Sequence, residues 1–176
     1  MDVGADFCKF INNIECQEKI ALDINPDTIQ YANRGVRVVN DDIINMESIT
    51  DASVDIAFAS NFFEHLPDKV TFIKTLQEIN RVLRQCGKLL ILQPNIAVLH
   101  GAYWDFIDHY IPLSHTSIVE ALYLTDYQPV EVRARFLPYT NKSRLLMHPF
   151  LVRMYLKLPL AHYSLDKQTW IIGEKK

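Results

Sequence analysis

Short apolar runs alternate with helix-like segments along the first half of the chain, and this alternation limits the fold more than any other feature. Five runs are strand-like: residues 1–3, 19–24, 36–39, 54–59 and 88–93. Three segments between them are helix-like, namely residues 7–14, 26–33 and 69–83, and in the last of these apolar residues recur every three or four positions. Alternating units of this length predict an α/β fold with a mostly parallel, doubly wound sheet and helices on both faces.

The second half follows a different pattern. Ser117 and Glu120 have the spacing of a capping box and predict a helix over residues 117–124. Alternation over 129–137 and an apolar run over 168–173 predict two further strands. Between them, residues 138–167 contain three prolines around a short helix-like segment, 148–157, and we interpret them as an inserted flap. We therefore expect one domain over 1–176, with a cofactor-binding half, 1–95, and an acceptor-side half, 96–176.

Charge and cysteine content exclude several classes of protein. A net charge of −3 without a broad basic stripe argues against a nucleic-acid partner. Three scattered cysteines without metal-ligand spacing predict a reducing compartment, no disulfide framework and no metal. No apolar run approaches the roughly 18 residues of a membrane span, and we expect no leader before the first strand. We expect a cytoplasmic protein without an integral membrane segment, and its homo-oligomeric state is left open.

The first turn has the features of a nucleotide-cofactor site. Asp2, Val3 and Gly4 lead from a strand into a helix-like segment, and Asp23 ends the second strand 19 residues after Gly4. A carboxylate with this spacing can accept hydrogen bonds from ribose hydroxyls. In an alternative interpretation, Asp23 caps a helix that begins at Pro26. The glycine run departs from the usual pattern, because Asp6 and Cys8 stand where further glycines are expected.

Five short motifs in order resemble the class I S-adenosylmethionine-dependent methyltransferases, and the type 11-like methyltransferase domain in particular. They are Asp2-Val3-Gly4, Leu22-Asp23-Ile24, Asp41-Asp42-Ile43, the stretch from Asn61 to Leu66 and the stretch from Arg81 to Gly87. The resemblance covers residues 1 to about 95. It implies a Rossmann-like, seven-stranded, mostly parallel sheet with a C-terminal antiparallel strand, and S-adenosylmethionine as the cofactor.

The resemblance also implies where the cofactor binds. Gly4 and Ala5 would approach its methionine portion, and Asp42 and Ile43 its adenine, whereas Asp41 would either join them or only form the turn. Asp6 would lie beside the methionine carboxylate and repel it, or turn towards the ammonium group. The complete predicted set is Gly4, Ala5, Asp6, Asp23, Ile24, Asp41, Asp42, Ile43, Ser60 and Asn61.

Candidate catalytic residues follow the fourth and fifth strands. Asp108 and His109 are adjacent, so the carboxylate could orient the imidazole as a base, and His65 follows the fourth strand. Each histidine could instead be a purely structural residue of its loop. Tyr103, Trp104 and Tyr110 could form an aromatic wall around an acceptor, and Lys142 and Arg144 in the flap would suit a sugar or phosphosugar.

The main functional prediction is methyl transfer to an oxygen or nitrogen of a small molecule, with a sugar or glycan precursor as one candidate. Two alternatives remain open. The departures in the glycine run favour a catalytically degenerate methyltransferase-like module that binds or scaffolds. A nicotinamide-dependent oxidoreductase would also use Asp23 on ribose, but the chain lacks a recognisable hydride-site pair.

Overall fold

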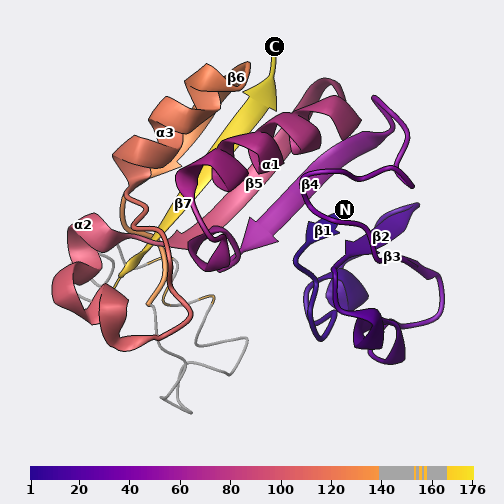
Figure 1. The fold of residues 1–176 in the computed structure, drawn as a ribbon, viewed down its shortest axis with the longest axis horizontal. Helices are drawn as coiled ribbons and strands as arrows, with labels where there is room; N and C mark the ends of the chain where they lie inside the picture. Colours follow the sequence, from indigo (N-terminus) through magenta and orange to yellow (C-terminus); the bar gives the residue numbers. More distant parts are fainter. Residues whose placement is uncertain (139–152, 154, 156, 158–165) are drawn as a thin grey trace.

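The computed structural model describes residues 1–138, 153, 155, 157 and 166–176, and seven strands of this part form one sheet in the order β3-β2-β1-β4-β5-β7-β6 (Figure 1). Strands β1 to β5 run parallel, and β7 is antiparallel to both β5 and β6. The predicted fold class is confirmed. The strands are β1 (Asp2–Val3), β2 (Lys19–Leu22), β3 (Val36–Val39), β4 (Val54–Ser60), β5 (Leu83–Pro94), β6 (Tyr127–Arg133) and β7 (Gln168–Lys175).

Two longer helices pack on the same face of the sheet, as Figure 1 shows. Helix α1 (Lys69–Val82) presents Leu76 and Ile79, and α3 (His115–Leu124) presents Leu122, to a core that also contains Ile91. Asp68 caps α1 by accepting from the Thr71 N–H at 2.7 Å. The remaining helical elements are short: α2 (Ile96–Leu99), η1 (Ile11–Asn13), η2 (Pro26–Gln30), η3 (Phe63–His65) and η4 (His100–Asp105).

The opposite face is covered near its β1–β3 end by the chain that follows β1. Ile11 of η1 is fully buried against Ala21 of β2 and Cys8. Predicted helices over 7–14 and 26–33 are wrong in type, because only the 3-10 turns η1 and η2 form there. Left-handed backbone at Asp6 and Cys8, with φ of 42° and 54°, turns the chain too sharply for an α-helix to start.

Several predicted boundaries in the second half also shift. Helix α3 (His115–Leu124) begins two residues before Ser117, because Ser114 is its cap and Ser117 is the third helical residue that completes the capping box. Strand β6 spans Tyr127–Arg133 instead of 129–137, although the Phe136 N–H still bonds Gln168 O at 3.0 Å. The predicted flap and its helix 148–157 lie almost entirely outside the described residues. Among the described residues, no helix is long and apolar enough to cross a membrane.

Candidate active site

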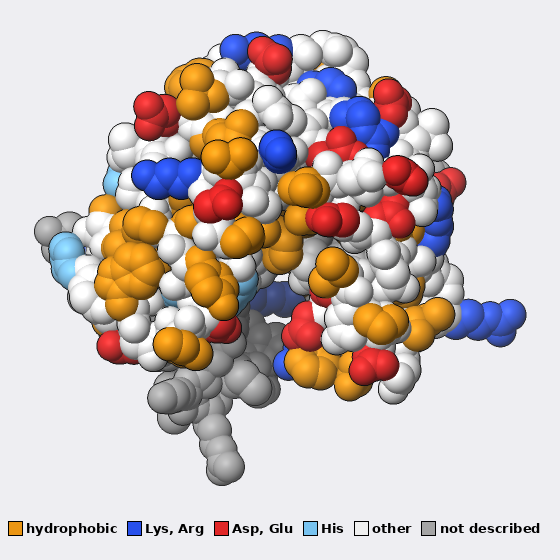
Figure 2. All heavy atoms as spheres, viewed as in Figure 1, with side chains coloured by type: hydrophobic (Ala, Val, Ile, Leu, Met, Phe, Trp, Pro, Cys, Tyr) orange, Lys and Arg blue, Asp and Glu red, His pale blue; other side chains and the backbone are white. Residues whose placement is uncertain are grey.

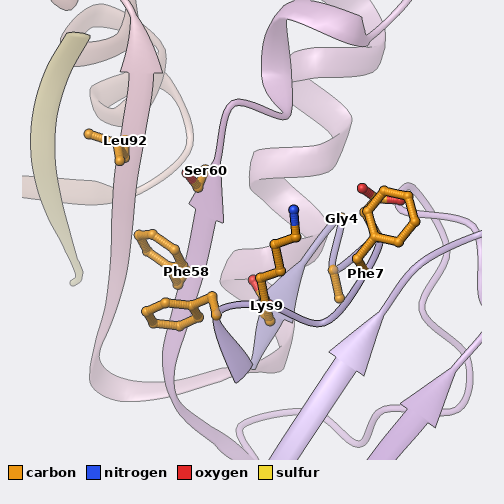
Figure 3. A pocket seen from close by; sticks show the side chains of 10 residues that line it. Gly4, Phe7, Lys9, Phe58, Ser60 and Leu92 are labelled. Carbon is orange, nitrogen blue, oxygen red and sulfur yellow. The ribbon is translucent and has the colours of Figure 1, made fainter. Parts of the chain in front are cut away.

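A cavity of about 360 Å³ lies at the carboxyl edge of the sheet, beside the point where the strand order reverses between β1 and β4 (Figure 3). Open α/β sheets bind their ligands at such an edge. Four of the predicted cofactor contacts line this cavity: Gly4, Ala5, Asp6 and Ser60. Its other lining residues are Asp2, Phe7, Lys9, Phe10, Phe58 and Leu92.

Gly4 shapes the first turn in a way that no other residue could. Its φ is +68°, and a Cβ built on it would lie 2.2 Å from Cδ2 of Phe62. Backbone N–H groups of Gly4 and Ala5 both donate to Leu22 O, at 2.9 and 3.1 Å. These bonds tie the turn to the end of β2, so the backbone at the cavity wall is held in place.

Asp23 joins the cavity wall through Asp6. One carboxylate oxygen of Asp23 accepts from the Asp6 N–H at 2.7 Å, and the other accepts from the Asn25 N–H at 2.9 Å. The cap of η2 is Asn25, whose side chain accepts from the Asp27 N–H, so Asp23 is not the helix cap of the alternative interpretation. Each carboxylate oxygen has two acceptor sites, and Asp23 therefore keeps capacity for a ligand.

The other predicted cofactor contacts lie outside the cavity wall. Asp41 accepts from both the N–H and the hydroxyl of Ser48, at 2.7 and 2.9 Å, and Asp42 accepts from the Ile44 N–H at 3.1 Å within a tight turn. Ile43 is partly buried in that turn, and Ile24 is 73% exposed after β2. Asn61 accepts from the Gln168 amide at 2.8 Å.

The candidate catalytic residues meet in one cluster beyond β4 and β5, but in a different pairing from the predicted one. Asp108 lies against His65, with its carboxylate 3.4 Å from Nδ1 and its backbone oxygen 2.9 Å from the same atom. His109 is buried, and its Nδ1 lies 2.8 Å from Tyr103 O. Burial lowers the pKa of His109, and burial raises the pKa of the neighbouring Glu64 carboxyl.

The sequence matches the family model of the methyltransferase domain over residues 1–91, which is more than half of the chain. The chain belongs to this methyltransferase family. S-adenosylmethionine is accordingly its cofactor, and the nicotinamide-dependent alternative is set aside. No curated protein matches the sequence.

Solved methyltransferases share the fold at low sequence identity. A SAM-dependent methyltransferase from Archaeoglobus fulgidus superimposes with a TM-score of 0.70 at 20% identity, over 99% of this chain and 84% of the other. One from Thermotoga maritima, described as a possible histamine N-methyltransferase, superimposes with a TM-score of 0.71 at 17% identity, over 99% of this chain and 80% of the other. One from Methanosarcina mazei superimposes with a TM-score of 0.70 at 14% identity, over 99% of this chain and 90% of the other.

Two charged residues of this methyltransferase line the cavity although the sequence did not single them out. Asp2 is 4% exposed, and this burial raises its pKa to about 6. A hydrogen bond from the backbone of Ile11 acts in the opposite direction and lowers the pKa. Lys9 extends between the Ser60 side of the cavity and the first turn in Figure 3, with its ammonium 5.5 Å from the centre of the Phe7 ring. The signal for Asp2 was its place in the Asp-Val-Gly motif, whereas nothing in the sequence marked Lys9.

Aromatic residues flank the histidine cluster of the methyltransferase. Tyr103 is fully buried and donates its hydroxyl to Ile111 O at 2.6 Å, so it supports the loop instead of facing an acceptor. Trp104, Phe106 and Tyr110 are exposed by 49%, 43% and 60%. Figure 2 shows hydrophobic side chains gathered on the side of the molecule where η4 lies, while positive and negative side chains are interspersed over the rest of this face.

Proposed function

We propose that this methyltransferase acts on an oxygen or nitrogen atom of a small molecule, with a sugar or glycan precursor as the first candidate. The proximity of the two candidate sites along the chain carries this proposal: Ser60 lines the cavity at the end of β4, and His65 follows five residues later in η3. Methyl transfer depends chiefly on aligning the acceptor atom with the donor. An acceptor held between cavity and cluster satisfies that requirement.

Chemically, the cavity residues fit S-adenosylmethionine, which supplies an electrophilic methyl group on a sulfonium when it is bound. Asp23 has acceptor capacity for the ribose hydroxyls, and Ile24 follows it. Buried Asp2 offers a negative charge to the cationic methionine end, and Lys9 offers a positive charge to its carboxylate. In this assignment Lys9 offsets part of the repulsion that Asp6 exerts on the same carboxylate.

The remaining predicted contacts keep the roles that the family resemblance implies. Gly4 and Ala5 let the cofactor approach the backbone of the first turn, and Ser60 and Asn61 border it at the end of β4. We assign adenine to the turn after β3, with Asp42 and Ile43 as its contacts. Asp41 is assigned to holding that turn, where its two carboxylate oxygens accept from the N–H and the hydroxyl of Ser48.

On the acceptor side, we assign proton removal to the histidine cluster. His65 is the better placed imidazole, because Asp108 lies against its Nδ1 and 36% of its side chain is exposed. His109 packs edge-on against the His65 ring, at 5.3 Å between centres, and supports it from the buried side. Trp104 and Tyr110 offer exposed aromatic faces, which suit stacking against a sugar ring or a heterocycle.

Composition supports the sugar or phosphosugar class, through Lys142 and Arg144, which lie outside the described residues. A cytoplasmic location is supported by three free cysteines, Cys8, Cys16 and Cys86. We also propose that residues 1–176 act as one domain whose acceptor-side half is 96–176.

Calorimetry with S-adenosylhomocysteine tests the cofactor assignment. We expect micromolar binding by the unchanged chain and a large loss in Asp23→Ala, and no measurable binding would favour the degenerate binding module instead. A panel of small hydroxyl and amine compounds, sugars included, incubated with labelled S-adenosylmethionine then tests the acceptor class.

His109→Ala and His65→Gln should lower turnover and leave S-adenosylhomocysteine affinity unchanged, with exposed His100→Ala as the matched control. Unchanged turnover in either cluster variant would remove that histidine from the mechanism.

A further inference from the structure

Glu64, His65 and His109 come together as a cluster that methyl transfer alone does not require. One potential ligand atom from each residue lies within 4.8 Å of the others, and Nε2 of His65 is 3.9 Å from Oε1 of Glu64. The residues come from η3 and from the loop after η4, 44 positions apart for the two histidines. No spacing pattern in the sequence could have revealed them as a set, and the sequence predicted no metal.

The backbone fixes the tautomer of both imidazoles. Nδ1 of His65 lies 2.9 Å from Asp108 O, and Nδ1 of His109 lies 2.8 Å from Tyr103 O. A carbonyl oxygen can only accept, so both Nδ1 atoms carry the hydrogen and Nε2 is the basic nitrogen of each neutral ring. Metal-binding histidines are oriented by this kind of Nδ1–H contact to a carbonyl or carboxylate.

Glu64 supplies a buried carboxyl group, whose ionised form a bound cation would stabilise. It is 1% exposed, and its Oε2 accepts from the Gln93 amide at 2.7 Å. Its Oε1 is the oxygen that lies nearest to His65 Nε2. A buried carboxylate is strongly disfavoured unless a positive charge or several donors compensate it.

We propose that Glu64 Oε1, His65 Nε2 and His109 Nε2 bind one divalent transition-metal ion of the zinc class. Two imidazoles and one carboxylate select such an ion over magnesium or calcium, which prefer oxygen ligands alone. Ligand distances of about 2.0–2.2 Å require the three atoms to approach one another by a small movement. His65, at 36% exposure, is the side chain placed to make that movement and to leave the fourth position open on its exposed side.

The inference rests on the cluster geometry, and it bears on the acceptor assignment above because both use Nε2 of His65. With the ion bound, His65 Nε2 is a ligand, so it no longer serves as a free base. The metal state therefore decides which of the two roles the histidine has.

Zinc titration by calorimetry of the tag-free chain, after dialysis against a chelator, tests the site. We expect one equivalent of Zn²⁺ per chain and a loss of affinity above about 100-fold in His65→Gln, because even outer-shell partners of a metal ligand are worth 10–100-fold. Glu64→Gln should weaken binding as well. His100→Gln, which changes an exposed histidine outside the cluster, should bind like the unchanged chain.

Cobalt substitution separates this site from the free cysteines. Co²⁺ should give visible d–d bands without a thiolate charge-transfer band, and His65→Gln should abolish those bands. Absence of stoichiometric zinc binding, unchanged affinity in His65→Gln or a thiolate band would each overturn the inference. S-adenosylhomocysteine binding by the same variants reports on the cofactor site independently, so failure of one proposal does not imply failure of the other.

Discussion

Gly4 is the residue of the first turn whose replacement should cost most. Alanine there would adopt a left-handed φ of +68° and place its Cβ 2.2 Å from the Phe62 ring. The left-handed backbone alone costs about 1–2 kcal/mol for a non-glycine residue, and the ring must also move. We expect Gly4→Ala to lower the free energy of unfolding, measured in urea, by more than about 2 kcal/mol.

Phe62→Ala supplies the control for the contact. If the ring causes part of the loss, the cost of Gly4→Ala should be smaller in the Phe62→Ala background, leaving mainly the backbone contribution. Equal costs in both backgrounds would show that the ring yields freely and that the contact constrains nothing.

Asp6 stands at a second left-handed position of the same turn, with φ of 42°. Asp6→Gly removes a negative charge beside the proposed position of the cofactor's carboxylate. We expect S-adenosylhomocysteine to bind several-fold more tightly by calorimetry, with folding stability changed by less than about 1 kcal/mol because relaxed backbone strain offsets the flexibility of glycine.

Asp126→Gly is a matched control, since Asp126 also has a left-handed φ, 61°, and is not part of the cavity wall. Its cofactor affinity should be unchanged. An unchanged affinity in Asp6→Gly itself would reject repulsion as the effect of Asp6.

At the scale of single elements, sequence periodicity predicted best where packing on one face determines the structure. The helix expected over 69–83 is α1, Lys69–Val82, because its apolar residues repeat with the period that the core imposes. The segments 7–14 and 26–33 were also expected to be helices, but backbone strain at Asp6 and Cys8 reduces the first to η1, and only the 3-10 turn η2 forms in the second. Local propensity carries no information about that strain.

Ser114 allows a test of how its cap stabilises helix α3. The sequence pattern had predicted the cap at Ser117, three residues later in the chain. The Ser114 hydroxyl accepts from the Ser117 N–H at 3.1 Å at the start of α3. Ser114→Ala should lower the free energy of unfolding by about 1 kcal/mol. Thr116→Ala, an exposed position in the same turn, should change it by less than about 0.5 kcal/mol, and equal effects of the two changes would contradict the capping role.

Over the whole molecule, the order of strand ends predicted which residues meet at the sheet edge. Gly4, Ala5, Asp6 and Ser60 line the cavity there, because each lies at the carboxyl end of a parallel strand and these ends share one edge, and their part in binding the cofactor stays a prediction. Lys9 was missed, and Asp108 was paired with the wrong histidine. Both depend on how loops turn in three dimensions, which hydrophobic pattern does not encode.

Buried Asp2 gives the apo protein a distinctive dependence of stability on pH. Its pKa is about 6 when folded and about 3.9 when unfolded, so between these values the folded chain holds a proton that the unfolded chain has lost. Stability therefore falls as the pH rises from about 4 to about 6 and is level above that range. The full difference between the two pKa values corresponds to a loss of at most about 3 kcal/mol in the free energy of unfolding. Asp2→Asn should remove the share that Asp2 contributes and leave that of Asp166, whose pKa burial also raises to about 6. Exposed Asp105→Asn should follow the unchanged chain in urea melts at pH 5, 6 and 7.

The cofactor should reverse the effect of that buried charge. If the cationic end of the methionine portion lies against Asp2, binding requires the ionised carboxylate, and cofactor affinity should increase as the pH rises from 5 to 7. S-adenosylhomocysteine retains the ammonium group and allows the measurement by calorimetry without turnover. In Asp2→Asn the increase should disappear. A pH-independent affinity in the unchanged chain would mean that Asp2 is buried for the sake of the first turn alone, because a carboxylate that pairs with the ligand must release its proton when the ligand binds.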